Sequence, residues 1–296
     1  MRQRPWYRRK RVLLLAFVLL LFGLSRLEVL RFRYQETELQ SYLERQTERT
    51  VRFGRTSPEE RGIQYLQVGR SDRLPLVEFV HGSPGSLDAY RHYLEQPQLL
   101  ARANLLAADR PGFGHSDFGR AEPSLARQAE RIAAILQDWP GVPKVLVGHS
   151  MGGPVISKMA MLYPDLVDGL VMVAPSISPY LEPSNTWRKV LDWIPLRWLT
   201  PPALRVCNQE IIPLREELDW MMSDWAALQI PVTVVQGSED VLVPAGNADF
   251  AERMLPDGPV QIRMIEGGDH FILWSELPVV VAEILGVLEQ LGPTEH

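Results

Sequence analysis

Three side chains of the sequence could together perform nucleophilic catalysis, and they occur in the order Ser150, Asp240 and His270. Ser150 stands between Gly148 and Gly152, directly after a short apolar run and at the start of a helical pattern. In such a strand–turn–helix setting a strained turn projects the serine hydroxyl, and the glycines let strand and helix approach. His270 would take the proton of Ser150, while Asp240 would hold the imidazole tautomer and stabilise the imidazolium. The pattern predicts a serine nucleophile that attacks a carbonyl carbon.

A second loop carries the groups that this reaction needs around the carbonyl oxygen. The stretch H-G-S-P-G at positions 81–85 follows another apolar run. Acyl transfer builds negative charge on the oxygen, so two backbone N–H groups must already point at it. We expect these groups from Met151, the residue after the nucleophile, and from Ser83, because Pro84 has no N–H. His81 is expected to brace the loop rather than to react.

Structural alternatives exist for these residues. Asp240 could cap its own loop, in which case Glu239 or Asp269 would be the carboxylate of the triad. The six histidines are scattered and show no metal-ligand spacing, so we expect no metal site. His149 neighbours Ser150 and is expected to point away from it, along the end of the strand.

Composition excludes several classes of protein. The net charge of −5 argues against nucleic acid as the main partner. The single cysteine, Cys207, excludes a disulfide framework and any all-cysteine zinc or iron–sulfur site. Neither a P-loop nor a G-x-G-x-x-G motif occurs, and we expect no cofactor.

Short apolar runs and helical patterns alternate along the chain. Seven runs end in turn residues and predict strands, at 63–68, 76–80, 105–108, 145–147, 170–173, 232–235 and 260–265. Helical patterns lie between many of them. Apolar runs without alternation indicate strands that are buried on both faces. Residues 57–296 are therefore predicted as one α/β domain, with a mostly parallel central sheet flanked by helices.

One insertion interrupts this alternation. Residues 176–224 contain four tryptophans, with Trp225 directly after them, and six prolines. Short broken helices rich in tryptophan are typical of a lid over an apolar pocket, and we expect this insertion to contribute to substrate binding. The alternative is that the tryptophans pack the lid onto the main domain.

Residues 1–30 have the composition of a membrane-targeting segment. Six Lys or Arg side chains lie within residues 2–11, and residues 12–24 carry no polar side chain. Residues 12–30 are predicted as a short signal-anchor in the membrane, with a cleaved export signal or a buried helix as alternatives. The cationic end would stay in the cytoplasm, which places the remaining chain on the extracytoplasmic side, periplasmic or extracellular. Residues 31–56 are predicted as a linker or stalk.

Taken together, these loops resemble the α/β-hydrolase superfamily, in particular its single-domain serine hydrolases with a helical lid. The resemblance covers residues 64–291 and includes the stretch D-R-P-G-F-G-H-S at 109–116. In the family this stretch is usually a structural loop, which implies that Asp109, His115 and Ser116 are not catalytic. Dehalogenases and epoxide hydrolases of the family carry aspartate at the elbow and differ from this chain there.

The resemblance does not specify a substrate. The apolar lid favours a hydrolase of carboxylic esters with hydrophobic substrates, working through an acyl-enzyme on Ser150 that water, activated by His270, hydrolyses. The expected partner is a small-molecule ester or amide. Cofactor-free perhydrolases share the pattern, and a non-catalytic ligand-binding fold is a further alternative.

Prolyl aminopeptidases are also similar in part. Their H-G-G-P-G loop resembles H-G-S-P-G here, but they usually carry tryptophan where Met151 stands. Such an enzyme also needs an acid in the lid for the substrate amine, and Glu210, Glu216 or Glu217 could supply it.

Overall fold

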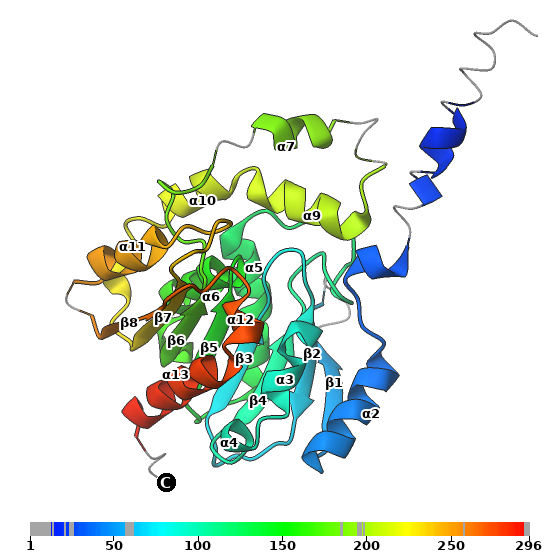
Figure 1. Cartoon of the computed structure of the whole chain (residues 1–296). Helices are drawn as coiled ribbons and strands as arrows, with labels where there is room; N and C mark the ends of the chain where they lie inside the picture. Colours follow the sequence, from blue (N-terminus) through cyan, green and yellow to red (C-terminus); the bar gives the residue numbers. More distant parts are fainter. Residues whose placement is uncertain are drawn as a thin grey trace, which may run out of the picture.

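The computed structural model describes residues 13, 15–20, 22–23, 27–56, 62–183, 186–193, 197, 199–256 and 258–292. Its centre is an eight-stranded sheet in the order β1-β2-β4-β3-β5-β6-β7-β8 (Figure 1). The strands are β1 (Val51–Arg55), β2 (Gln64–Val68), β3 (Leu76–Val80), β4 (Asn104–Ala108), β5 (Lys144–His149), β6 (Gly169–Val173), β7 (Val232–Gly237) and β8 (Val260–Ile265). β1 and β2 are antiparallel to their neighbours, and the pairs from β4 to β8 are parallel.

The seven apolar runs named above are all strands of this sheet, with slightly different ends. Every residue of β3, β4, β5, β6 and β7 is buried. Such strands lack hydrophobic alternation because helices cover both faces of a parallel sheet. The predicted α/β architecture, a mostly parallel sheet flanked by helices, is confirmed.

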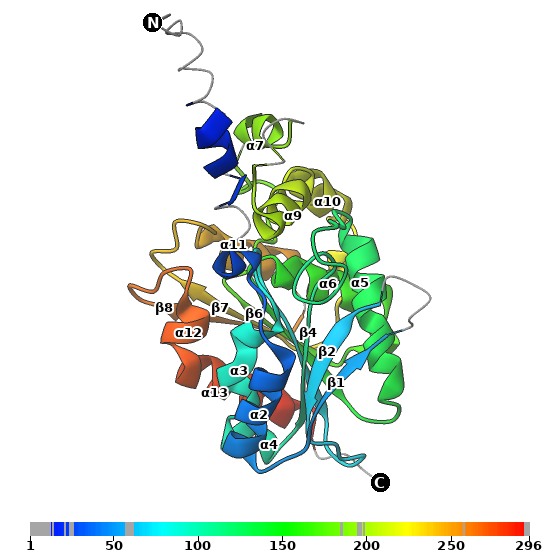
Figure 2. The ribbon, with the colours of Figure 1, turned by 90° about the vertical axis from the view of Figure 1, so that its right-hand side faces the viewer.

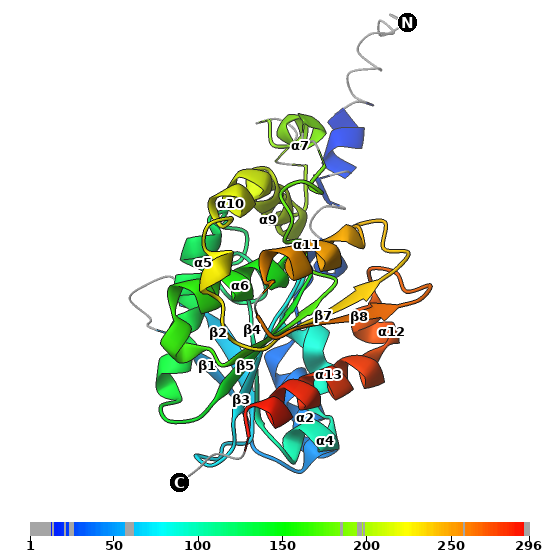
Figure 3. The ribbon, with the colours of Figure 1, turned by 90° about the vertical axis from the view of Figure 1, so that its left-hand side faces the viewer.

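Two hydrophobic cores lie on opposite faces of the sheet (Figures 2 and 3). The first is covered by α5 (Leu125–Ala133), α6 (Gly152–Leu162) and α11 (Gly246–Met254). The second is covered by α2 (Glu36–Thr47), α3 (Arg91–Leu94), α4 (Pro97–Leu100), α12 (Ile272–Ser275) and α13 (Leu277–Gln290). Short 3₁₀ helices lie between these elements, at η1 (Glu28–Arg31), η2 (Leu87–Tyr90), η3 (Ala134–Asp138), η4 (Pro164–Leu166) and η5 (Trp225–Ala227).

The segment predicted as a linker or stalk, 31–56, is instead an integral part of the domain. Leu39 and Leu43 of α2 are buried in the second core, as expected for apolar residues four apart on one helix face. β1 then pairs along its whole length with β2 and forms the edge of the sheet. Its sequence, V-R-F-G-R, has no apolar run because an edge strand is half exposed.

The N-terminal segment is described only in part. The cationic run at 2–11 and positions 12, 14, 21 and 24–26 of the predicted anchor lie outside the described residues. Residues 15–20 are helical and mostly exposed, on the same side of the molecule as the lid (Figures 2 and 3). Among the described residues, no helix has the length and apolar character needed to cross a membrane.

The predicted lid lies over the carboxyl ends of the parallel strands (Figure 1). Its described helices are α7 (Thr186–Leu191), α9 (Pro202–Ile211) and α10 (Leu214–Trp220). Trp187, Trp193 and Trp220 are 56%, 64% and 69% exposed, whereas Trp225 is fully buried in the first core. Trp198 lies outside the described residues. The alternative, in which the tryptophans pack the lid onto the main domain, is therefore wrong for these three residues.

Candidate active site

Ser150 occupies a strained turn between β5 and α6. Its φ is +52°, in the left-handed region that residues other than glycine rarely adopt. A Cβ at Gly148 would lie 2.6 Å from the carbonyl oxygen of Gly152, and a Cβ at Gly152 would lie 2.1 Å from that of Val80. Both flanking positions therefore require glycine, as the G-x-S-x-G pattern predicts.

Asp240 and His270 are brought together by neighbouring strands, in the loops after β7 and β8. His270 Nδ1 lies 2.8 Å from Asp240 Oδ2, while Asp240 Oδ1 accepts the backbone N–H groups of Leu242 and Val243. Burial by itself would raise the pKa of Asp240, but the hydrogen bonds from His270 and these amides outweigh it and lower the pKa. The ionised carboxylate accepts the Nδ1 proton, which leaves Nε2 of His270 as the basic nitrogen.

The two alternative carboxylates lie elsewhere. Glu239 is exposed, and Asp269 Oδ1 accepts the backbone N–H of Phe271. The geometry therefore selects Asp240 as the partner of His270, in agreement with the sequence prediction.

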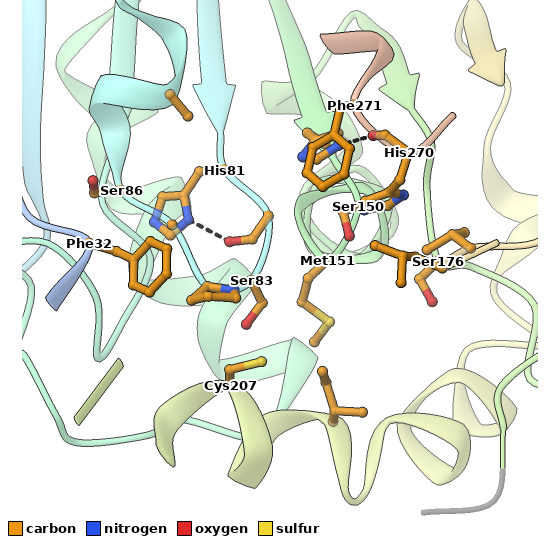
Figure 4. Close-up of a pocket in the computed structure, with 18 of the residues that line it drawn as sticks. Phe32, His81, Ser83, Ser86, Ser150, Met151, Ser176, Cys207, His270 and Phe271 are labelled. Atoms are coloured by element: carbon orange, nitrogen blue, oxygen red, sulfur yellow. Dashed lines mark hydrogen bonds between the residues drawn. The ribbon is translucent and has the colours of Figure 1, made fainter. Parts of the chain in front are cut away.

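Ser150 and His270 line the same cavity, of about 740 Å³ (Figure 4). The described side chain of His270 forms a hydrogen bond with Asp240 and none with Ser150 Oγ. In enzymes without substrate this contact is often loose and tightens when the substrate binds. The arrangement of the three residues fits a serine nucleophile with a histidine base.

The loop with Gly82 and Ser83 lies directly against the nucleophile. A Cβ at Gly82 would lie 2.9 Å from His149 Nδ1 and 3.0 Å from Ser150 Cβ, so a side chain there would force these neighbours to shift. Ser83 and Met151 line the cavity beside Ser150 (Figure 4). The two residues expected to supply oxyanion N–H groups are therefore neighbours of the reacting hydroxyl.

His81 braces this loop, as expected. Its Nε2 accepts the backbone N–H of Arg110 at 2.9 Å, and its Nδ1 lies 2.7 Å from the carbonyl oxygen of Gly82. Because Nε2 is an acceptor, the proton must be on Nδ1 and is donated to Gly82. Burial, and then the neighbouring Arg110 charge, hold the pKa of His81 well below its usual value, so the ring is neutral.

His149 does not point away from the site, contrary to expectation. Its ring centre is 4.9 Å from that of His270, and its Nε2 lies 3.1 Å from the carbonyl oxygen of His270. Burial, and then the proximity of His270, lower the pKa of His149 to about 3, so the ring packs as a neutral group. No cluster of three or more His, Cys, Asp or Glu side chains in the described part of the chain is arranged to hold a metal ion.

The cavity has two further walls, of which sequence reasoning missed one. One comes from the N-terminal segment, where Phe32 and Arg33 line the cavity. This segment is fixed by Tyr34, whose hydroxyl donates to Asp109 at 2.9 Å, and by Arg33, which donates to His115 at 2.8 Å. The sequence did not indicate that Phe32 and Arg33 line the cavity, because nothing in residues 31–35 suggests proximity to a loop 75 residues later.

The second wall comes from the lid. Glu182, Arg188, Cys207, Ile211 and Leu214 all line the cavity. The prediction that the insertion contributes to the cavity is therefore correct, although residues other than tryptophan do so.

The D-R-P-G-F-G-H-S loop is structural in the way that the resemblance implies. Asp109 is fully buried and accepts hydrogen bonds from Tyr34, Leu87 and His115. Ser116 Oγ accepts the backbone N–H of Gln64.

The lid acids of the aminopeptidase alternative are not at the cavity. Glu210 forms a buried ion pair with Arg110, and Glu217 accepts the backbone N–H of Leu125. Glu210, Glu216 and Glu217 are all absent from the cavity lining, whose carboxylates come from Asp88 and Glu182.

Comparisons with known proteins agree with this geometry. The family model described as alpha/beta hydrolase fold matches residues 75–205. The chain is 26% identical to a monoglyceride lipase of Rattus norvegicus over 238 residues, which is 69% of this chain and 78% of the lipase. It is 34% identical to a human (lyso)-N-acylphosphatidylethanolamine lipase over 124 residues, 39% of this chain and 34% of the lipase.

A solved structure of a membrane phospholipase A, described as a bacterial virulence factor, has the same fold. Its TM-score is 0.62 at 19% identity, and the match covers 95% of this chain and 98% of the other. The sheet order, the strained serine turn, the family match and these relatives lead to one conclusion. This chain has the α/β-hydrolase fold, its residues 75–205 match the family of that name, and it is similar to proteins named as lipases.

Proposed function

We propose that this chain is a serine hydrolase of carboxylic esters with hydrophobic acyl groups. The observation that carries the proposal is the Asp240–His270 hydrogen bond of 2.8 Å at a cavity that also holds the strained Ser150. Glu239 is exposed and Asp269 accepts the backbone N–H of Phe271, so Asp240 is the carboxylate that orients the histidine.

The reaction would proceed in two steps. His270 Nε2 removes the proton of Ser150 as Oγ attacks the ester carbonyl, and the resulting oxyanion is held by the N–H groups of Ser83 and Met151. Collapse expels the alcohol, which takes the proton from His270, and leaves an acyl group on Ser150. Water then attacks with His270 as base again, which releases the acid and restores the hydroxyl.

The walls of the cavity favour an apolar acyl group. Met151, Leu214 and Leu242 line it together with the aromatic side chains Phe271 and Trp274. A cavity of about 740 Å³ lies within the range typical of sites for ligands of drug-like size. The lipase names of the relatives support the same substrate class.

The distribution of exposed apolar side chains supports a membrane as the source of substrate. Among the described residues after position 32, and apart from Leu162 and Met264, the large exposed apolar side chains lie in the lid and the loops around the cavity. They are Tyr180, Trp187, Val190, Leu191, Trp193, Trp220, Val241, Leu242, Phe271 and Trp274. Exposed apolar side chains gathered in one region of a protein favour an interaction site, and tryptophan is enriched at membrane–water interfaces. We therefore retain the proposal that residues 12–30 anchor the chain, with the domain on the extracytoplasmic side.

A fluorophosphonate probe that labels activated serines tests the proposal. Labelling of the wild type but not of a folded Ser150→Ala variant is expected. A panel of p-nitrophenyl esters should then show a preference for longer acyl chains. Absence of labelling in well-folded protein would overturn the enzymatic proposal in favour of a ligand-binding fold, and cleavage of a proline arylamide would favour the aminopeptidase.

A further inference from the structure

Arg110 lies at the centre of a buried polar network between the lid and the loop behind the nucleophile. The side chains of Arg110 and Glu210 have no exposed surface. A guanidinium has five N–H donors, and all five are used here. Nε donates to the carbonyl oxygen of His81 at 2.8 Å, and Nη1 donates to Gln128 and Glu210, each at 2.8 Å. Nη2 donates to Glu210 at 2.9 Å and to the carbonyl oxygen of Gly82 at 3.1 Å.

The hydrogen bond from Arg110 to Gly82 holds the peptide unit between Gly82 and Ser83, which carries one of the proposed oxyanion donors. The carbonyl of Gly82 and the N–H of Ser83 belong to one planar trans peptide, in which the two groups point in opposite directions. Arg110 Nη2 and His81 Nδ1 both donate a hydrogen bond to this carbonyl oxygen. Fixing the carbonyl fixes the direction of the Ser83 N–H, which is one of the two proposed oxyanion donors.

Glu210 makes this arrangement depend on the lid. It lies on α9 and pairs with Arg110 through both carboxylate oxygens, the two-pronged geometry that suits a guanidinium. Without Glu210, the charge of Arg110 would be buried and unpaired, which is strongly unfavourable. The docked lid therefore stabilises the position of Arg110, and Arg110 in turn orients the loop at 81–83.

We propose that Arg110 is a positioning residue for the oxyanion hole and that Glu210 couples it to the lid. The Ser83 N–H then has its catalytically competent orientation only while α9 is docked with Glu210 on Arg110. This proposal deepens the proposed function, since it assumes that the Ser83 N–H stabilises an oxyanion during ester hydrolysis.

Two variants separate positioning from mere stability. Arg110→Lys keeps a cation beside Glu210 but has only three donors on one nitrogen, so it cannot serve Glu210, Gln128 and both carbonyls together. The double variant Arg110→Met with Glu210→Leu removes both buried charges, and such apolar replacements are often neutral for stability. Lys158→Gln is the matched control, because Lys158 pairs with Asp224 at the end of the lid and does not contact the loop.

Catalysis is measured as kcat and KM on a p-nitrophenyl ester, with inhibition by a trifluoromethyl ketone that forms an oxyanion on Ser150. Loss of a whole oxyanion donor lowers kcat by about 10²–10³-fold. We expect a partial loss of about 10–100-fold in kcat for both variants, with little change in KM. The affinity for the ketone should fall in parallel, and the control should behave as wild type.

Amide hydrogen exchange tests the positioning without turnover. Faster exchange at 81–86 in both variants is expected, with the remaining sheet unchanged. Unchanged exchange there would overturn the proposal, as would a double variant with wild-type melting temperature and wild-type kcat. The proposed function can fail separately, if the wild type neither hydrolyses esters nor reacts with the ketone. Faster exchange at 81–86 in the variants would then still support the coupling between Arg110, Glu210 and the loop.

Discussion

Glu78 lies in the middle of β3, and its substitution by glutamine should change how the stability of the protein depends on pH. The residue is fully buried between Leu106 and Leu146 of the adjacent strands. Neither of its carboxylate oxygens has a hydrogen-bond partner among the described residues. Burial raises the pKa of Glu78 from 4.5 to about 8, because the charged form loses its hydration.

The size of the effect follows from this shift. Between pH 4.5 and 8 the unfolded chain has lost the proton of Glu78 while the folded chain keeps it, so the free energy of unfolding falls as the pH rises. The slope is about 1.4 kcal/mol per pH unit, which amounts to about 4 kcal/mol between pH 5 and pH 8. Glu78→Gln keeps the shape without the ionisation and removes this contribution.

Urea unfolding at several pH values between 5 and 8 measures the contribution of Glu78 to the free energy of unfolding. The variant should gain stability relative to wild type as the pH rises, by about 4 kcal/mol over this range. Glu38→Gln, at an exposed position of α2, controls for the loss of one negative charge. Parallel stability curves for Glu78→Gln and wild type would refute the view that Glu78 is buried as a neutral acid.

Further predictions concern the site. Asp240→Asn should lower kcat by about 10³–10⁴-fold with folding intact, because the amide cannot hold the required imidazole tautomer; steady-state kinetics and circular dichroism check this. Gly152→Ala should reduce the yield of folded protein or lower its melting temperature, because the new Cβ would lie 2.1 Å from a carbonyl oxygen of β3. Phe32→Ala should raise KM for long-chain esters more than for acetate, since Phe32 lines the cavity. Trp187→Ser with Trp193→Ser should weaken binding to anionic lipid vesicles and leave hydrolysis of a soluble short ester unchanged.

The sheet could be predicted because fully buried strands leave a strong mark on the sequence. β5 and β6 each contain a continuous apolar run, β3 is apolar except for Glu78, and the G-x-S-x-G pattern at the end of β5 identifies the turn. β1 leaves no such mark, since only Val51 of its five residues is fully buried.

The parts that could not be predicted depend on contacts between distant segments. Phe32 and Arg33 reach the cavity because hydrogen bonds to Asp109 and His115 hold residues 33 and 34. Glu210 was a candidate for binding a substrate amine, but its pairing with Arg110 depends on how the lid docks. Composition also does not reveal which side of a lid its tryptophans occupy.

The proposed reaction passes through an acyl-enzyme on Ser150, and this intermediate can be trapped. The protein is mixed with p-nitrophenyl butyrate and quenched with acid in the steady state. Its peptides are then analysed by mass spectrometry. A butyryl group is expected on the peptide that contains Ser150, and none on the corresponding peptide of the Ser150→Ala variant. Undiminished hydrolysis by the folded Ser150→Ala variant, with no adduct in either protein, would contradict the proposed reaction.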